Sequence, residues 1–271
     1  MELRDVLLQV FGFIISVAAS IAGTIIWIKW KERRENKPLN QILNFGSDDL
    51  IFVFSHREQY PFSILPFTST EDFLAMNNFI SALMKIGWKG SVSVRDTKRL
   101  LDADKEKNLV TFCSAKSNSF TEEVIEKILS EYDDVFYFQK IENSEKWRIT
   151  DGVGNFPSMT YGQYEEYVKD KGVKKEEVAE QSFDDVAIIT KVKNPWNAMN
   201  KIFIIAGIRG IGTWGASECI KKNWNEIYNQ LESNEKNCDF SALIKINYRN
   251  CDIKKIKIHS IKILKPRRLN R

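Results

Sequence analysis

The chain has 271 residues and a mass of 31.5 kDa, which corresponds to about two average domains of roughly 150 residues or to one large α/β domain. Hydrophobic residues make up 43% and charged residues 28%, which excludes collagenous, coiled-coil and wholly disordered chains. The formal net charge is +4, but residues 254–271 alone carry eight positive side chains and no acid. This basic segment predicts a solvated edge, a nucleic-acid-binding surface or a contact with anionic lipid. We favour the solvated edge, because no aromatic residues intervene to stack bases.

Cysteine and histidine are too sparse and too dispersed for the common metal sites. The four cysteines lie far apart without a CxxC pair, and the chain has two histidines, His56 and His259. Structural zinc requires such residues at short spacing, so we expect no metal site, and we predict no cofactor. A dispersed set of cysteines also indicates a reducing compartment.

Residues 6–28 form a run of 23 residues without a charged side chain. At about 1.5 Å per residue, a helix of this length spans the roughly 30 Å hydrocarbon layer of a bilayer. We therefore expect residues 1–30 to form a single transmembrane helix, and the run ends in tryptophan and lysine rather than at a cleavage site for a signal peptidase. Basic residues follow the run and predict that the rest of the chain faces the cytoplasm at the inner, or cell, membrane: Lys29, Lys31, Arg33, Arg34 and Lys37.

Small and weakly polar residues recur along one face of this segment. Gly12, Ser16, Ser20 and Thr24 follow one another at intervals of four, and Gly23 lies beside them. Such a face lets helices pack closely or lines a watery lumen, so it predicts a homo-oligomer and, as the bolder interpretation, a pore. The alternative is a plain anchor in the lipid bilayer, whose hydroxyl groups bond back to their own helix.

Residues 31–48 are polar and charged, and we interpret them as a juxtamembrane helix or linker. We expect a cytoplasmic domain over residues 49–271, in which apolar runs rich in β-formers alternate with helical spacing. The predicted strands are 50–55, 92–95, 109–114, 186–192 and 202–206, and the predicted helices are 69–87, capped by Ser69 or Thr70 and ended by Gly87, 121–132 and 216–231. This alternation predicts a Rossmann-like α/β fold with a mostly parallel sheet covered on both faces.

Three regions depart from that alternation. Residues 136–141 and 146–150 flank a short polar segment, which predicts a β-hairpin insertion. Residues 242–248 and 256–264 alternate and interleave lysine with isoleucine, which is typical of antiparallel edge strands. Residues 151–183 are polar, and we interpret them as an excursion over the sheet or a lid.

The strongest ligand signal follows the predicted strand 202–206. Gly210, Gly212 and Gly215 have GxGxxG spacing between a strand and a helix, where backbone amides and the helix N-terminus can bind a phosphate. Arg209 adds a fork of donors and Thr213 a hydroxyl group. The alternative is that the glycines only allow the helix to pack tightly on the sheet.

The same turn departs from a complete dinucleotide-binding site. Such a site has Asp or Glu at the end of the next strand to bind the ribose, and this chain has Tyr248 and Arg249 there. The turn also lies near the end of the chain. We therefore disfavour redox chemistry with NAD.

Another phosphate contact is predicted after the strand 109–114, where Lys116, Ser117 and Asn118 precede a helix. A capped turn without a ligand explains these residues equally well. The residues 193–196 after the strand 186–192 complete the set of polar strand ends, with Trp196 either a stacking surface or part of the core.

The first two strands end in residues suited to phosphate contacts and to proton transfer. Arg57 and Arg95 fit phosphate contacts. His56 and Glu58 are the candidates for a general base. A histidine at a strand end is more often a structural hydrogen-bonding group, so these catalytic assignments are weak.

Four strand-end segments resemble Rossmann-like sensor domains of prokaryotic conflict systems: IAGIRGIGTWGA, FCSAKSN, FSHRE and KNPW. The resemblance covers residues 49–271, and the nearest comparison is with membrane effectors of nucleotidyltransferase-based antiphage systems, Hailong among them. It implies a soluble part that binds a nucleotide or oligonucleotide signal, made by a partner nucleotidyltransferase, and a membrane part that acts as a pore-forming effector.

The sequence leaves three functions open. The first is a ligand-gated homo-oligomer in the membrane. The second is a membrane-tethered enzyme that hydrolyses a nucleotide or an NAD-like substrate with His56 or Glu58 as base. We rank the enzyme lower, because no nucleophile, base and orienting residue can be grouped from the sequence. The third is a docking protein that only localises a partner.

Overall fold

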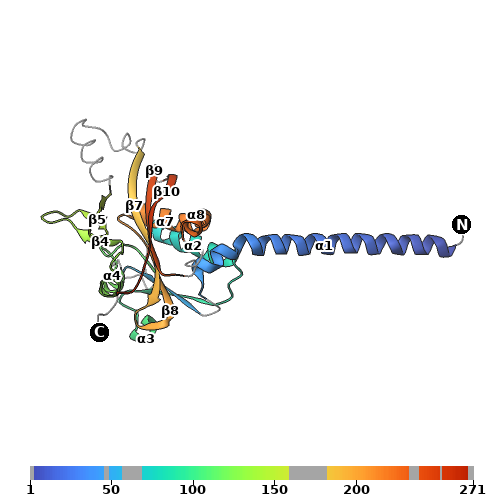
Figure 1. Ribbon diagram of the computed structural model, residues 1–271, viewed down its shortest axis with the longest axis horizontal. Coiled ribbons are helices and arrows are strands. Elements are labelled where there is room, and N and C mark those ends of the chain that lie inside the picture. The colour runs from blue at the N-terminus through green and yellow to red at the C-terminus, as the bar shows by residue number, and fades with distance from the viewer. Residues whose placement is uncertain are drawn as a thin grey trace, which may run out of the picture.

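The computed structural model describes residues 3–45, 49–56, 69–158, 182–231, 238–250 and 252–267, with side chains of the first helix described from residue 20 onward. A long helix, α1 (Leu3–Leu43), projects from the body of the molecule (Figure 1). The body contains the other helices of the described residues: α2 (Thr70–Lys85), α3 (Asp102–Lys105), α4 (Ser119–Glu131), α7 (Gly210–Lys222) and α8 (Trp224–Gln230). Arg57, Glu58 and most of the expected excursion at 151–183 lie outside the described residues.

The main sheet is mixed and mostly parallel. Its order is β10-β9-β7-β8-β3-β1-β2, and its strands are β1 (Leu50–Phe54), β2 (Val92–Asp96), β3 (Asn108–Phe112), β7 (Ser182–Asn194), β8 (Asn197–Gly207), β9 (Phe240–Arg249) and β10 (Asp252–Ile263). β1, β2, β3, β8 and β9 run in one direction, and β7 and β10 run in the other. The predicted mostly parallel α/β fold and the antiparallel C-terminal strands are thus confirmed.

Apolar clusters cover both faces of this sheet. On one face, α2, α7, α8 and the end of α1 pack on strand residues such as Phe52 and Phe203. On the other face, α4 packs on strand residues such as Val53 and Ile204. A second sheet, β4-β5-β6, also joins this face, with β4 (Tyr137–Lys140), β5 (Trp147–Thr150) and β6 (Asn155–Pro157). The β4–β5 pair is the hairpin insertion that the sequence predicts.

The strands β7 and β8 differ from our expectation. They form an antiparallel hairpin whose turn is Pro195 and Trp196, so residues 193–196 do not join the carboxyl ends of the parallel strands, where we expected them. The turn therefore lies at the edge of the sheet opposite the carboxyl end of β8. Trp196 stacks on Phe120 of α4 at 5.7 Å between ring centroids, so it belongs to the packing of that face.

The C-terminal end of α1 is part of the core. Leu39, Ile42 and Leu43 are buried in the cluster formed with α2 and α8, and their spacing is that of an apolar helix face. The helix continues through Pro38 without interruption. Residues 31–43 are thus helical, as in the helix alternative for this segment, and the core begins before residue 49, where we expected it to start.

Two lysines bind the carbonyl groups at this end of α1. Lys191 Nζ donates to the oxygen of Gln41 at 3.4 Å, and Lys201 Nζ donates to the oxygen of Asn44 at 3.0 Å. Cations are favoured at a helix C-terminus, where the carbonyl groups lack helical partners. Burial, together with the charge of Lys201, lowers the pKa of Lys191 to about 8. The first helix is therefore bound to β7 and β8 by polar contacts as well as by packing.

Helix α7 begins earlier than the sequence indicates. We expected one helix over 216–231, but α7 starts at Gly210 and a break at Asn223 separates it from α8. Gly212 and Gly215 consequently lie inside the helix rather than in a loop before it. Within the described residues, no helix is both long enough and apolar enough to span a membrane.

Candidate functional site

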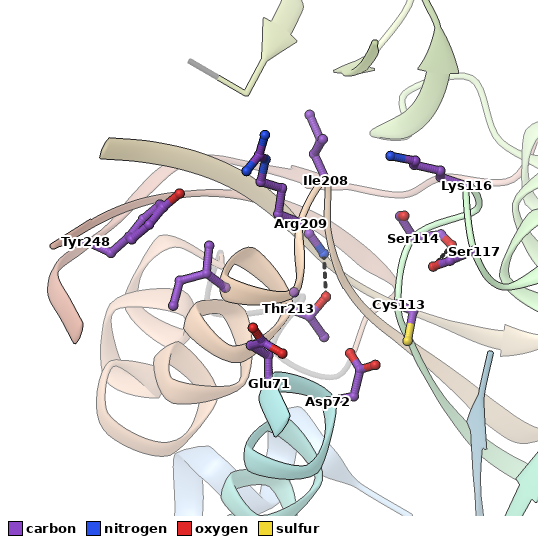
Figure 2. Close-up of a pocket in the computed structure, with 13 residues that line it drawn as sticks. Glu71, Asp72, Cys113, Ser114, Lys116, Ser117, Ile208, Arg209, Thr213 and Tyr248 are labelled. Carbon is purple, nitrogen blue, oxygen red and sulfur yellow. Dashed lines mark hydrogen bonds between the residues drawn. The ribbon is translucent and has the colours of Figure 1, made fainter. Parts of the chain in front are cut away.

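A cavity of about 480 Å³ opens at the carboxyl ends of β3 and β8, the edge at which open α/β sheets bind ligands (Figure 2). Its walls come from the turn after β3, the turn after β8, the first turn of α2 and the end of β9. The polar and charged side chains in these walls are Glu71, Asp72, Cys113, Ser114, Lys116, Ser117, Arg209, Thr213 and Tyr248.

The turn after β8 forms one wall. Arg209 lies at the N-cap of α7, where its side chain makes no capping hydrogen bond, and it lines the cavity together with Gly210 and Thr213. The hydroxyl of Thr213 accepts a hydrogen bond from the amide of Gly207 at 3.0 Å. The predicted residues Arg209, Gly210 and Thr213 are thus gathered at one place, beside a helix N-terminus that favours negative charge.

Gly212 and Gly215 have a different role from the one that the GxGxxG pattern predicts. A Cβ at Gly212 would lie 2.5 Å from the carboxylate of Asp185, and a Cβ at Gly215 would overlap the side chain of Ile246. Neither residue lines the cavity, as far as the described residues extend. These two glycines allow close packing of α7 on the sheet, which is the alternative interpretation of the motif.

Asp185 lies beneath the N-terminus of α7. Its Oδ2 accepts a hydrogen bond from the amide of Arg209 at 3.1 Å, and the residue is fully buried. Burial raises the pKa of Asp185 to about 6, although the backbone amides that donate to it act in the opposite direction. Sequence reasoning missed this residue, because it lies near the start of β7 and ligand contacts were expected only after the carboxyl ends of strands.

The turn after β3 forms the facing wall with Ser114, Lys116 and Ser117. Asn118 does not reach the cavity, because it is buried as the N-cap of α4. Its Oδ1 accepts from the amides of Phe120 and Thr121, each at 3.1 Å. The structure therefore supports the capped turn for Asn118 and leaves Lys116 and Ser117 as ligand-binding candidates.

Two acidic residues in the first turn of α2 also line the cavity. Glu71 is half-buried and lies beside Gly210, and Asp72 is buried. We did not predict them, because acids in a first helical turn are common complements to the helix dipole. The only signal in the sequence was their position in the helix that follows β1.

Cys113 joins this acidic side of the cavity. Its φ of 77° is unusual for a residue with a side chain, and such conformations concentrate at functional sites. Burial and the neighbouring Asp72 carboxylate raise the pKa of its thiol. A raised pKa disfavours the thiolate, so Cys113 is poorly suited to act as a nucleophile.

Other predicted residues lie away from the cavity. Arg95 Nε lies 3.5 Å from Asp104 Oδ2, and His56 Nδ1 lies 3.6 Å from Asp96 Oδ1. Of the described residues, neither Arg95 nor His56 belongs to the cavity wall. Arg57 and Glu58 lie outside the part of the chain that the structure describes, so the predicted base Glu58 stays a prediction.

The small-residue face of α1 is described from Ser20 onward. A Cβ at Gly23 would meet no atom within 4 Å, and Thr24 Oγ1 donates to the oxygen of Ser20 at 2.9 Å. This hydroxyl thus bonds back to its own helix, as in the anchor interpretation. Gly12 and Ser16 lie in α1, but their side chains are outside the described set.

The described residues contain no group of three or more His, Cys, Asp or Glu side chains arranged to hold a metal ion. The chemistry of the cavity is instead that of a binding site with two cationic side chains, two carboxylates, hydroxyl groups and one tyrosine. Comparison with known proteins yields no match to the chain among protein families, curated proteins or solved structures.

Proposed function

We propose that the protein is a membrane-anchored effector whose globular domain binds a phosphate-bearing ligand and transmits occupancy to an assembly of its N-terminal helices. The observation that carries this proposal is the course of α2. Its first turn lines the cavity with Glu71 and Asp72, and near its last turn Asn36 Nδ2 of α1 donates to the oxygen of Lys85 at 2.8 Å. One helix of 16 residues thus joins the candidate ligand site to α1.

Polar contacts tie α2 to α7, which also begins at the cavity. Lys85 Nζ donates to the oxygen of Lys221 at 3.1 Å, and Lys221 Nζ donates to Asn78 Oδ1 at 3.0 Å. Asn78 Nδ2 in turn donates to Ser217 Oγ at 3.2 Å. We therefore treat α2 and α7 as one rigid pair, which a ligand contacts at its N-terminal end and α1 contacts at the other.

The anchor in this proposal is the uncharged run at residues 6–28 of α1, with the globular domain in the cytoplasm. The exposed apolar residues at its described end support this assignment, among them Trp27 and Trp30. Lys31 lies over the Trp27 ring at 5.3 Å, and Arg34 lies over the Trp30 ring at 5.4 Å. Tryptophan followed by basic residues is typical of a helix at the boundary between lipid and cytoplasm.

The ligand in this proposal is anionic, because Arg209, Lys116 and the hydroxyls of Ser114 and Ser117 face one cavity beside the N-terminus of α7. A gate requires that the ligand bind one assembly better than another, and a difference of about 1.4 kcal/mol shifts their ratio tenfold. The resemblance to antiphage membrane effectors extends the proposal to prokaryotic defence, with a nucleotidyltransferase as the source of the ligand.

Dye release from liposomes tests the proposal with the full-length protein. We expect release only after addition of a nucleoside monophosphate, and we expect Ser20→Leu to abolish release without weakening nucleotide binding. Ala22→Leu is the matched control, because a position two residues away is about 200° around the helix. Release without nucleotide, or release that survives Ser20→Leu, would contradict a gated pore.

A second variant tests the coupling through α2. Asn36→Ala removes the contact with Lys85, and we expect nucleotide binding to be kept while dye release falls. Asn40→Ala removes the same side chain one turn further along α1 and serves as control. Equal release by the two variants would show that α2 does not carry the signal.

A further inference from the structure

The charges in the cavity are divided between two sides. In the view of Figure 2, Arg209 and Lys116 lie on one side and Glu71 and Asp72 lie on the other, with Tyr248 at a third position. A ligand that carried negative charge at both ends would therefore meet carboxylates at one of them. Like charges at close range are unfavourable, so the lining selects a ligand with an anionic end and an end that donates hydrogen bonds.

The two carboxylates differ in what they can offer to a ligand. Asp72 is 1% exposed and interacts with the thiol of Cys113. Glu71 is half-buried, and its side-chain atoms lie 3.1 to 3.3 Å from where a Cβ of Gly210 would be. The Glu71 side chain thus lies against the first residue of α7 and lines the cavity from α2, on the side opposite Arg209 in Figure 2.

We infer that the cavity binds a single ribonucleotide, with the phosphate at Arg209 and Lys116, the ribose hydroxyls at Glu71 and the base against Tyr248. This inference rests on the proposed function and narrows its ligand class. A carboxylate can accept hydrogen bonds from the two neighbouring hydroxyl groups of a ribose. The end of β9 has no such carboxylate, and Glu71 of α2 supplies one from across the cavity.

The size of the cavity favours one nucleotide over an oligonucleotide. Small-molecule sites measure about 300–1,000 Å³, and the cavity of about 480 Å³ lies in the lower part of this range. Proteins that bind single strands instead offer a charged groove with several aromatic platforms along it. Among the described residues, the cavity wall contains one tyrosine, which provides a stacking surface for one base.

Binding measurements on the full chain in detergent micelles test this assignment. The probes are AMP, GMP, CMP and UMP, the 2′,3′-dideoxy form of the tightest binder, and inorganic phosphate. We expect the dideoxy form to bind about 10- to 100-fold more weakly, which is the effect of losing hydrogen bonds to a charged group. Equal binding of the two forms would overturn the ribose contact.

The variant Glu71→Gln completes the test. We expect this variant to bind the ribonucleotide more weakly by a similar factor and to bind the ribonucleotide and its dideoxy form about equally. The reason is that the substitution and the loss of the ribose hydroxyls remove the same interaction. Glu122→Gln is the matched control, because Glu122 is the exposed acid in the first turn of α4. Discrimination that persists in Glu71→Gln would overturn the role of Glu71.

The same measurements separate this inference from the proposed function. If binding is lost in Arg209→Gln but does not depend on the ribose hydroxyls, the ribose contact fails and the phosphate site stands. If neither the four nucleotides nor inorganic phosphate binds, both the ribonucleotide site and the proposed function fail.

Discussion

The turns after β3 and β8 have the same local pattern and lie at the same edge of the sheet, yet they use their helices differently. After β3, Asn118 caps α4 with its side chain and accepts from two backbone amides. After β8, Arg209 occupies the N-cap of α7 and its side chain makes no capping hydrogen bond. The side chain at the N-cap thus closes the N-terminus of α4 but not that of α7.

The two turns also differ in what lies beneath them. Asn118 Nδ2 donates to the oxygen of Phe112 at 2.7 Å and to Thr111 Oγ1 at 3.0 Å, so neutral groups surround it. Beneath α7 lies the buried carboxylate of Asp185. Four substitutions exploit this comparison.

The largest effect is expected for Asn118→Ala, which removes the cap of α4 and leaves buried polar groups without their partner. A lost cap costs about 1–2 kcal/mol and an unsatisfied buried group about 1–3 kcal/mol, so we expect a loss of about 4 kcal/mol in the free energy of unfolding. Urea denaturation of the full chain measures it. Arg209→Ala is the control at the equivalent position, and a similar loss there would remove the distinction between the two turns.

Asp185→Asn tests the buried carboxylate. The pKa of Asp185 is raised from 3.8 to about 6, so its contribution to stability is largest below about pH 4 and falls as pH rises through 6. A pKa difference of one unit corresponds to about 1.4 kcal/mol. The free energy of unfolding of the wild type should therefore fall by about 3 kcal/mol relative to that of Asp185→Asn between pH 4 and pH 7. Thermal denaturation across this range measures the difference. Asp102→Asn, at a fully exposed carboxylate, should follow the wild type.

Gly215→Ala tests the packing of α7 on β9. The added methyl group overlaps Ile246, and we expect a loss of about 2 kcal/mol in the free energy of unfolding, as is usual for overpacked sites. Gly210→Ala is the milder control, because its nearest neighbours belong to the flexible side chain of Glu71. An unchanged stability of Gly215→Ala would contradict a packing role for this glycine.

The smallest effect on stability is expected for Arg209→Asn, which gives α7 the kind of cap that α4 has. The backbone of Arg209 is extended, as an N-cap residue requires, so we expect a gain of about 1 kcal/mol in the free energy of unfolding. The same variant should lose nucleotide binding, measured by calorimetry. A variant that gains stability and still binds would show that the α7 N-terminus and Arg209 are not needed for the ligand.

Much of the fold could be predicted because local signals and tertiary structure agree. The helix α2 is an example: Ser69 accepts from the amide of Asp72 at 3.2 Å at one end, and Gly87 has φ 69° just beyond the other. Both residues were predicted as the limits of this helix. The β4–β5 hairpin was predicted for a similar reason, since its polar turn separates two short runs.

The direction of β7 could not be predicted, because the strand is buried on both faces and has no alternation to read. Asp185 was missed because it precedes the predicted strand 186–192, at the end where no ligand contact was expected. The packing of the end of α1 into the core was missed for another reason: Pro38 and many charges suggested a juxtamembrane helix or linker outside the fold, although Leu39, Ile42 and Leu43 already had helical spacing. In the site, Arg209, Lys116 and Ser117 were predicted because ligands bind after the carboxyl ends of strands in open α/β sheets. Residues that reach the site from other elements, such as Glu71, have no comparable pattern in the sequence.

Pro38 separates the buried end of α1 from the long part that projects from the domain. A proline within a helix removes one backbone hydrogen bond, which makes this the easiest point at which α1 can bend. From Pro38 to Leu3 the helix measures about 50 Å at 1.5 Å per residue, so a change of about 5° in direction displaces its far end by about 4 Å. A small change in the direction of α1 at Pro38 would therefore be amplified along the helix into a much larger displacement of its N-terminal end.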